Sequence, residues 1–310
     1  MEKRWESITN IGMVFPKLYS HANAGTGPIV ENLTKVLADP FFTAMEVSYI
    51  KDDAVRKKAA DYLQKSYVDI IFNGGSAFRE LKIDLSNLDA DVRKAGIQNA
   101  KLLVDQAYEL NASILHVVTG KDPGPDDRKQ ALDHFITSVK EICRYAQEKA
   151  DKYELTVSVE TGDRYFDRKY LLGPTNEAVE VIREIKRDYR NIGLLLDEGH
   201  FPVMQEDPHK ALWMAKDYLT HIHLGNSYVK DRSAKHFGDK HLPFNVPDSE
   251  IGVEELAKFI RTLFDIGFFS SPKPTRRPVM TFEVGAYDGE PEELVLANVK
   301  RVFGEAWGLV

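Results

Sequence analysis

Short apolar runs alternate with longer amphipathic stretches along the whole of this 310-residue chain. An apolar run of four to eight residues bounded by polar turns is typical of a buried strand, whereas apolar residues repeated every three or four positions predict a helix. The runs predict strands at Ile8–Phe15, Ala44–Ile50, Val68–Phe72, Ile114–Val118, Leu155–Val159, Ile192–Leu196, Leu219–His223 and Val279–Phe282.

The helical patterns fall between and after these strands. In one of them Phe135, Val139 and Ile142 would form a single buried stripe. The predicted helices are Ile29–Leu37, Asp53–Ser66, Ala90–Leu110, Asp126–Lys152, Asn176–Tyr189, Pro208–Asp217, Val253–Phe264 and Pro291–Phe303. Strands that alternate with helices imply parallel pairing, because a parallel neighbour needs a crossover connection. Repeating units without a linker predict an α/β fold, a single (β/α)8 TIM barrel that makes one domain of residues 1–310.

Two connecting segments refine this prediction. Gly25-Thr26-Gly27-Pro28 is the nearest approach to a dinucleotide-binding fingerprint, but it lacks the third glycine and a phosphate lysine. We interpret it as a loop whose proline leads into the next helix. Ser227–Ile251 is long for a connection between a strand and a helix. Its polar, proline- and histidine-containing composition predicts an ordered loop over the barrel mouth, serving as a lid or a substrate wall.

Composition excludes several classes of function. The formal net charge of -7 argues against a protein that tracks nucleic-acid phosphates, which normally has a basic face. The single Cys143 excludes an intrachain disulfide and a thiolate zinc cluster. No apolar run reaches the length of a membrane span, and Met1–Trp5 does not open a signal peptide. We therefore expect a cytoplasmic protein without a membrane partner.

Polar residues end several of the predicted strands. The fifth strand ends in Glu160, the sixth in Asp197, the seventh in His223 and the eighth in Glu283. The reactive groups of a (β/α)8 barrel lie at the carboxyl ends of its strands, and carboxylates with imidazoles are typical ligands of a divalent metal. We expect metal or catalytic roles for both glutamates and ligand roles for Asp197 and His223.

The two glutamates have an alternative interpretation, a structural ion pair with Arg164 or Lys121. The second and third strands also carry polar residues, Glu46 and Asn73, to which the pattern assigns no role.

Five further residues have two interpretations each. His200 follows Asp197 closely and is expected in the active site, with a helix cap as the alternative. His116 is either a core residue or an inner-site ligand, and His221, two positions before His223, is expected to be a satisfied core histidine. Asp239 and His241 lie in the long loop, where they form either a solvated pair or part of the substrate site.

The order Glu160, Asp197-x-x-His200, His223, Glu283 resembles the xylose-isomerase-like barrel superfamily, which includes ketose 3-epimerases, hydroxypyruvate isomerases, inosose dehydratases and endonuclease IV. The resemblance covers nearly the whole chain. It implies that Glu160, Asp197, His223 and Glu283 bind one metal and that His200 contacts the substrate. Glu160-x-x-x-Arg164 and His221–Gly225 also resemble epimerase segments. The expected substrate contacts are His116, Arg164, Asp239 and His241.

The resemblance implies a metal-dependent sugar isomerase or epimerase that abstracts a proton next to a carbonyl through a metal-stabilised enediolate. Glu160 and Glu283 would remove and return the proton. With a leaving group beta to the carbonyl, the same intermediate would make the enzyme a lyase or dehydratase of a keto-sugar or keto-glycoside. An endonuclease IV-like phosphodiesterase is a remote alternative, because Asn73 replaces the first histidine of that enzyme's metal set.

The expected cofactor is one divalent metal ion, manganese in the first place, with cobalt, magnesium or zinc as alternatives. The expected partner is a small carbohydrate, nucleic acid is disfavoured, and self-association as a homo-oligomer is left open.

Overall fold

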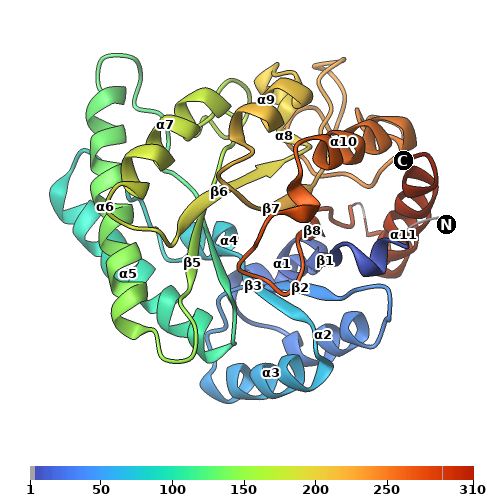
Figure 1. Ribbon diagram of the computed structural model, residues 1–310, viewed down its shortest axis with the longest axis horizontal. Helices are drawn as coiled ribbons and strands as arrows, with labels where there is room; N and C mark the ends of the chain where they lie inside the picture. Colours follow the sequence, from blue (N-terminus) through green and yellow to red (C-terminus); the bar gives the residue numbers. More distant parts are fainter. Residues whose placement is uncertain (1–3, 288) are drawn as a thin grey trace.

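Parallel strands close into a barrel at the centre of the computed structural model, which describes residues 4–287 and 289–310 (Figure 1). Each strand pairs with the next one in sequence, and the last closes on the first through the register Asn10↔Val279. The predicted (β/α)8 TIM barrel is thus confirmed. The strands are β1 (Asn10–Val14), β2 (Ala44–Val47), β3 (Asp69–Phe72), β4 (Ile114–Val117), β5 (Thr156–Glu160), β6 (Ile192–Asp197), β7 (Leu219–Leu224) and β8 (Val279–Phe282).

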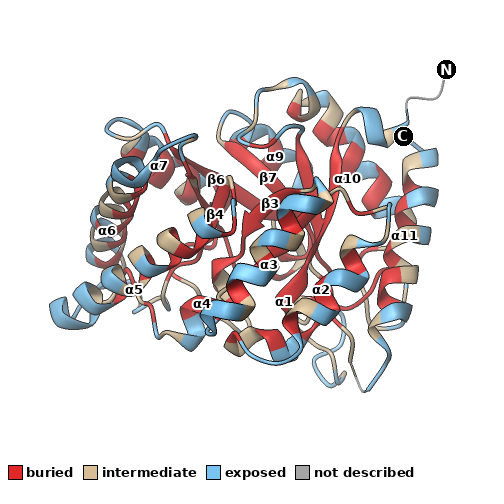
Figure 2. Cartoon of the chain, turned by 90° about the horizontal axis from the view of Figure 1, so that it is seen from below, coloured by how far each residue is buried: buried red, intermediate tan, exposed pale blue. Residues whose placement is uncertain are grey.

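Helices surround this barrel, and the longer ones have a buried face toward the strands and an exposed face toward solvent (Figure 2). The strands are buried on both faces, as parallel strands covered by helices must be. The stripe of Phe135, Val139 and Ile142 is fully buried, as its spacing predicts. The helices are α1 (Phe15–Leu18), α2 (Ile29–Leu37), α3 (Asp53–Ser66), α4 (Gly74–Glu80), α5 (Ala90–Glu109), α6 (Arg128–Lys149), α7 (Thr175–Lys186), α8 (His200–Met204), α9 (Pro208–Ala215), α10 (Val253–Asp265) and α11 (Glu292–Gly308).

Short helices at the barrel mouth are the elements that the sequence pattern did not predict. The first strand ends at Val14 rather than Phe15, because Phe15 begins α1 with a proline in its first turn. Helix α4 begins with two glycines, which have low helix propensity, but Asn73 caps it by accepting a hydrogen bond from the Gly75 amide. These short helices place side chains above the strand ends.

The long loop Ser227–Ile251 contains no regular helix or strand. Asn226, two residues after β7, holds it in place. Its Nδ2 donates to the carbonyl oxygens of Pro243 (3.2 Å) and Ile251 (3.0 Å), and its Oδ1 accepts from the Ile251 amide (3.1 Å). One asparagine thus fixes both the middle and the end of the loop over the mouth.

Among residues 4–287 and 289–310, no helix is long and apolar enough to cross a membrane. Residues 1–3, which belong to the segment examined for a signal peptide, lie outside the described residues.

Candidate functional site

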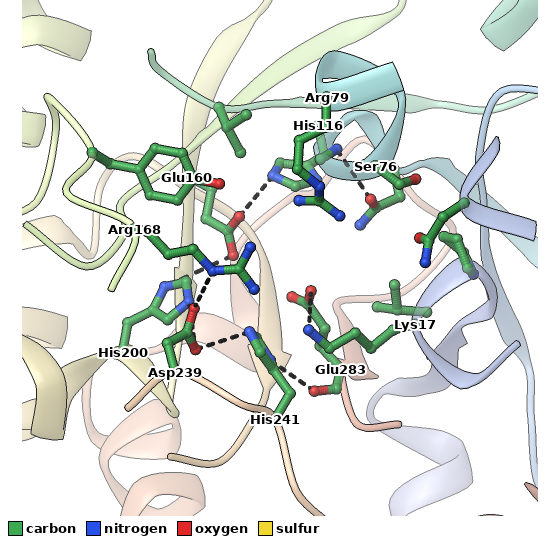
Figure 3. A pocket seen from close by; sticks show the side chains of 17 residues that line it. Lys17, Ser76, Arg79, His116, Glu160, Arg168, His200, Asp239, His241 and Glu283 are labelled. Carbon is green, nitrogen blue, oxygen red and sulfur yellow. Dashed lines mark hydrogen bonds and ion pairs between the residues drawn. The ribbon is translucent and has the colours of Figure 1, made fainter. Parts of the chain in front are cut away.

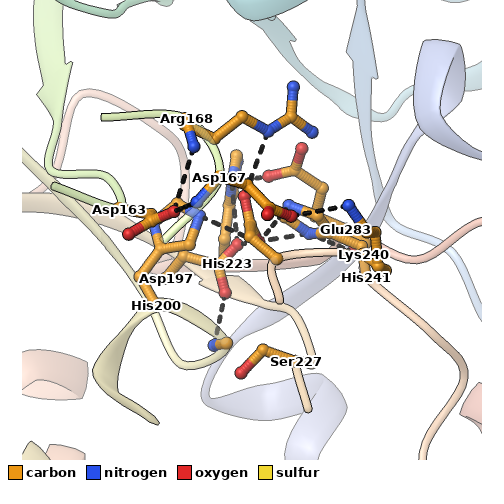
Figure 4. Close-up of polar contacts among 12 residues, drawn as sticks. Asp163, Asp167, Arg168, Asp197, His200, His223, Ser227, Lys240, His241 and Glu283 are labelled. Atoms are coloured by element: carbon orange, nitrogen blue, oxygen red, sulfur yellow. Dashed lines mark hydrogen bonds and ion pairs between the residues drawn. The ribbon is translucent and has the colours of Figure 1, made fainter. Parts of the chain in front are cut away.

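Four side chains converge at the carboxyl end of the barrel, where the sequence pattern places them. Glu160 and Asp197 are the last residues of β5 and β6, His223 lies next to the end of β7, and Glu283 follows β8. One ligand atom from each lies within 4.8 Å of the others, and three of them are visible in Figure 4. We call these four residues the candidate metal group. Closure of a parallel barrel brings them together, because all carboxyl ends of its strands meet at one face.

The inner atoms of the candidate metal group have no hydrogen-bond partner in the described part of the chain. They are Glu160 Oε1, Asp197 Oδ2, His223 Nδ1 and Glu283 Oε2, all buried. His223 Nδ1 lies 2.7 Å from Glu283 Oε2 and 3.4 Å from Glu160 Oε1. Burying unpaired carboxylate oxygens is costly unless a cation joins them. Three oxygens and one imidazole nitrogen fit a divalent first-row metal ion.

A fully buried glutamate beneath this group orients His223. Glu46 Oε1 lies 2.9 Å from His223 Nε2 and accepts a hydrogen bond from Thr281 (2.6 Å), while Oε2 accepts one from Asn73 (3.0 Å). Burial opposes ionisation of Glu46, but His223 and His221 together hold its pKa well below the usual value. Burial disfavours the charged form of His223, but the carboxylates around it, Glu46 and Glu283 first among them, raise its pKa well above the usual value in the absence of a metal. Glu46 accepts the hydrogen bond from Nε2, so Nδ1 is the nitrogen that faces the candidate metal group and would lose its proton to a bound metal ion.

The sequence pattern assigns Glu46 no role. A charged residue inside the apolar run of β2 could nevertheless have marked it as a functional candidate. His221 is fully buried, and its Nε2 has no hydrogen-bond partner of good geometry among the described residues. Its Nδ1 lies 3.1 Å from the Thr220 hydroxyl, and its Nε2 lies 3.3 Å from Glu46 Oε1.

His200, Asp239 and His241 form a second cluster beside the candidate metal group. His200 Nδ1 donates to the Thr161 carbonyl oxygen (2.7 Å), and His241 Nδ1 donates to that of Glu283 (2.9 Å). Their Nε2 atoms lie 3.6 and 2.9 Å from Asp239 Oδ1. Each imidazole is therefore fixed by a backbone carbonyl and directs its second nitrogen toward the loop aspartate.

The charges of these groups shift one another's pKa values. Burial disfavours the charged form of His200, but Asp239 and Asp197 raise its pKa well above the usual value. Burial likewise opposes ionisation of Asp239, and His241 with His200 nevertheless holds its pKa well below the usual value. In Asp197 burial prevails and the pKa is raised. The cluster thus contains an imidazole that stays protonated at neutral pH next to an ionised carboxylate.

Above both groups lies a small cavity, lined by residues from several strand ends (Figure 3). It includes His116, Glu160, His200, Asp239, His241 and Glu283. His116 is buried, with Nε2 2.9 Å from Glu160 Oε2.

Arg164 is the one expected substrate contact that the structure does not bring to this cavity. Its guanidinium pairs with Glu177 in a bidentate ion pair of 2.9 and 2.7 Å and donates to the Leu171 carbonyl oxygen. The cavity is lined instead by Lys17, Arg79, Arg168 and Tyr170, which the sequence pattern did not single out. They lie on loops and short helices, where no periodicity marks an inward position.

The sequence of this chain matches known proteins at low identity. Residues 37–300 match the family described as xylose isomerase-like TIM barrel. The D-psicose 3-epimerase of Ruminiclostridium cellulolyticum is 26% identical over 154 residues, 46% of this chain and 47% of that protein. The L-ribulose 3-epimerase of Methylomonas sp. is 23% identical over 149 residues, 47% of this chain and 49% of that protein. These matches span about half the length of each relative.

Solved structures extend the likeness of the fold over almost the whole chain. The structure of an L-ribulose 3-epimerase covers 97% of this chain and 95% of its own, with a TM-score of 0.72 and 14% identity. The IOLI protein with a bound zinc atom covers 97% and 98%, also with a TM-score of 0.72 and 14% identity. The family match over residues 37–300 and the barrel itself lead to one conclusion: the chain belongs to the xylose isomerase-like TIM barrel family.

Proposed function

We propose that this protein is a divalent-metal-dependent sugar isomerase or epimerase that abstracts a proton next to a carbonyl group. One observation carries the proposal: four buried ligand atoms, none with a hydrogen-bond partner among the described residues, converge beneath the cavity at the carboxyl ends of the strands. Two relatives support the substrate class, since they are named D-psicose 3-epimerase and L-ribulose 3-epimerase.

Glu160, Asp197, His223 and Glu283 would hold one metal ion, with manganese as the first expectation and cobalt, magnesium or zinc as alternatives. When bound, the ion would polarise the substrate carbonyl and make the neighbouring C–H group more acidic. Glu46 would keep His223 in the tautomer that presents Nδ1.

The two glutamates would move the proton. Glu160 keeps a second oxygen, Oε2, 2.9 Å from His116 Nε2, and Glu283 Oε1 lies 3.9 Å from Lys17 Nζ. Burial opposes ionisation of both, yet the adjacent histidines hold each pKa below its usual value. Ionised carboxylates at two strand ends would therefore flank the substrate carbon, one as the base and one, after protonation, as the acid.

A lyase or dehydratase acting on a keto-sugar or keto-glycoside is a second candidate, favoured by His200. Its raised pKa keeps the imidazole protonated, and it lines the cavity beside Asp239. A protonated group at that position could donate to a departing oxygen, which elimination requires and epimerisation does not.

Solvent exchange tests the proposal. The manganese-loaded protein would be incubated in deuterium oxide with a panel of ketoses, aldoses and 3-keto-glycosides, and the products read by NMR and mass spectrometry. We expect deuterium at one carbon next to a carbonyl. Isomer without deuterium would contradict proton transfer with solvent exchange, and loss of a leaving group would select the lyase. Two or three bound metal ions per chain, with cleavage of a phosphodiester, would favour the remote nuclease alternative.

A further inference from the structure

Three cationic side chains line the mouth of the cavity. Lys17 comes from α1 after β1, Arg79 from the end of α4 after β3, and Arg168 from the loop after β5. Figure 3 shows the ends of all three side chains turned toward the same space. Three separate elements thus contribute positive charge to the lining of one cavity.

None of these cations is engaged in a close ion pair within the described residues. Arg79 makes no ion pair or side-chain hydrogen bond there. Arg168 Nε lies 3.5 Å from Asp239 Oδ2, and Lys17 Nζ lies 3.9 Å from Glu283 Oε1. Both distances exceed an ordinary hydrogen bond of about 2.7–3.2 Å. Arg164, outside the cavity, makes the close bidentate contact expected of a structural arginine. The three mouth cations therefore keep donors free.

The carboxylates nearest these cations already have other partners. Asp239 faces His200 and His241, and Glu283 belongs to the candidate metal group. A divalent ion on Glu283 would neutralise the charge that Lys17 faces. Cations that share a small cavity repel one another unless an anion joins them. A neutral sugar would leave that repulsion in place.

We propose that the substrate is an anionic monosaccharide, whose carboxylate or phosphate is bound by Lys17, Arg79 and Arg168 while its carbonyl lies at the candidate metal group. This substrate class rests on the proposed function for the position of the carbonyl. The anion subsite itself stands on the three side chains, and guanidinium groups suit both carboxylate and phosphate oxygens.

Calorimetric titration of the manganese-loaded protein tests the proposal with three matched ligands: D-fructose, D-fructuronate and D-fructose 6-phosphate. We expect at least one anionic ligand to bind about tenfold or more tightly than D-fructose, with a preference that shrinks as sodium chloride is raised. The tighter of the two anions identifies carboxylate or phosphate as the recognised group.

Variants test whether Arg79 is responsible for the preference for the anionic ligand. Arg79→Gln should weaken binding of the anionic ligand about tenfold or more and leave D-fructose within about twofold, because only the anion contacts this residue. Arg79→Lys should retain part of the preference. Lys82→Gln removes an exposed charge near Arg79, outside the cavity, and should change neither affinity.

The anion subsite would be overturned if neither anion bound, or if both bound no more tightly than D-fructose. Equal effects of Arg79→Gln and Lys82→Gln on the affinity for the anion would also overturn it. If the protein exchanges the protons of neutral ketoses and binds anionic sugars no more tightly, the anionic substrate class is wrong but the proposed reaction stands. Anion binding without any proton exchange in the sugar panel would leave the subsite standing and remove the proposed reaction.

Discussion

Both ends of the barrel bury carboxylates, but the carboxylate oxygens at the two ends differ in their hydrogen-bond partners. At the amino end, Asp69 at the start of β3 accepts hydrogen bonds from Asn10 Nδ2 and from Arg276 Nε, the latter at 2.9 Å. Arg276 also donates to the Tyr67 carbonyl oxygen and lies over the ring of that tyrosine. At the carboxyl end, buried oxygens of Glu160 and Asp197 have no partner in the described residues.

The difference shows that burial of a charge alone says little about function. A carboxylate with a fixed arginine and an amide donor contributes to folding stability, whereas carboxylates that face one another oppose it until a cation binds. Residues at the amino end of such barrels serve stability and those at the carboxyl end serve chemistry. Five measurements can break or sharpen this contrast.

The largest effect is expected on turnover. Glu283→Gln and Glu160→Gln should each reduce the rate on the substrate found in the exchange panel by a factor on the order of 10² or more, because a carboxamide cannot transfer the proton. A variant that still exchanges the substrate proton without forming product would identify its missing glutamate as the returning acid. Near-parental turnover in either variant would exclude the two-carboxylate mechanism.

The second-largest effect is expected on metal content. Asp197→Asn should weaken manganese binding by roughly a hundredfold while the fold is kept, because one anionic ligand is lost. Elemental analysis after dialysis and circular dichroism measure the two properties. Removing one of several facing carboxylates should also leave the metal-free protein as stable as the parent or slightly more stable. Unchanged metal stoichiometry would remove Asp197 from the ligand set.

Glu46 should act through His223 rather than on the metal itself. Glu46→Gln should weaken manganese affinity by about tenfold, and Glu46→Leu by up to about a hundredfold, since the amide oxygen still accepts the Nε2 proton and leucine does not. Nitrogen NMR of the metal-free protein should show a change in the His223 tautomer in the leucine variant. Thr281→Val, which removes the hydroxyl that donates to Glu46 and lies 3.5 Å from the Ile222 carbonyl oxygen, is the matched control. An unchanged tautomer with weaker metal binding would assign Glu46 a structural role only.

At the amino end the prediction is reversed. Asp69→Asn should lower the free energy of unfolding by about 2 kcal/mol, because the Arg276 guanidinium loses its charged partner while it stays partly exposed. Manganese content and affinity should stay at the parental level. Denaturant unfolding and metal analysis measure the two properties. A loss of metal without a loss of stability would show that Asp69 does not serve stability alone.

The smallest effect concerns pH at the same end. Burial lowers the pKa of Lys273 to about 8, and its Nζ donates to the carbonyl of Leu219 (2.7 Å) at the start of β7. In the unfolded chain the pKa of this lysine is higher, at about 10.4. From about pH 8 to about pH 10.4 the unfolded chain therefore binds more protons than the folded one, and the free energy of unfolding rises with pH.

Lys273→Met should therefore be more stable than the parent at pH 7, by about 1 kcal/mol after allowance for partial exposure, and the gain should shrink as pH rises above about 8. Denaturant unfolding at pH 7, 8 and 9 measures the trend. The exposed Lys57→Met should show no such dependence, and a gain that is constant with pH would indicate an effect of packing alone.

The sequence by itself determined the barrel and the positions of Glu160, Asp197, His223 and Glu283. Apolar runs define the strands, and closure of eight parallel strands leaves their carboxyl ends only one common face, so a residue at a strand end is placed by local pattern alone. Tertiary structure decided which long side chains reach that face. Arg164 turns to Glu177, while Lys17, Arg79 and Arg168 turn inward. Glu46 gains its role only because β7 brings His223 to it across 177 positions of sequence. These side chains have many rotamers, and their partners are distant in the chain, so the closed barrel selects the contact that local sequence leaves open.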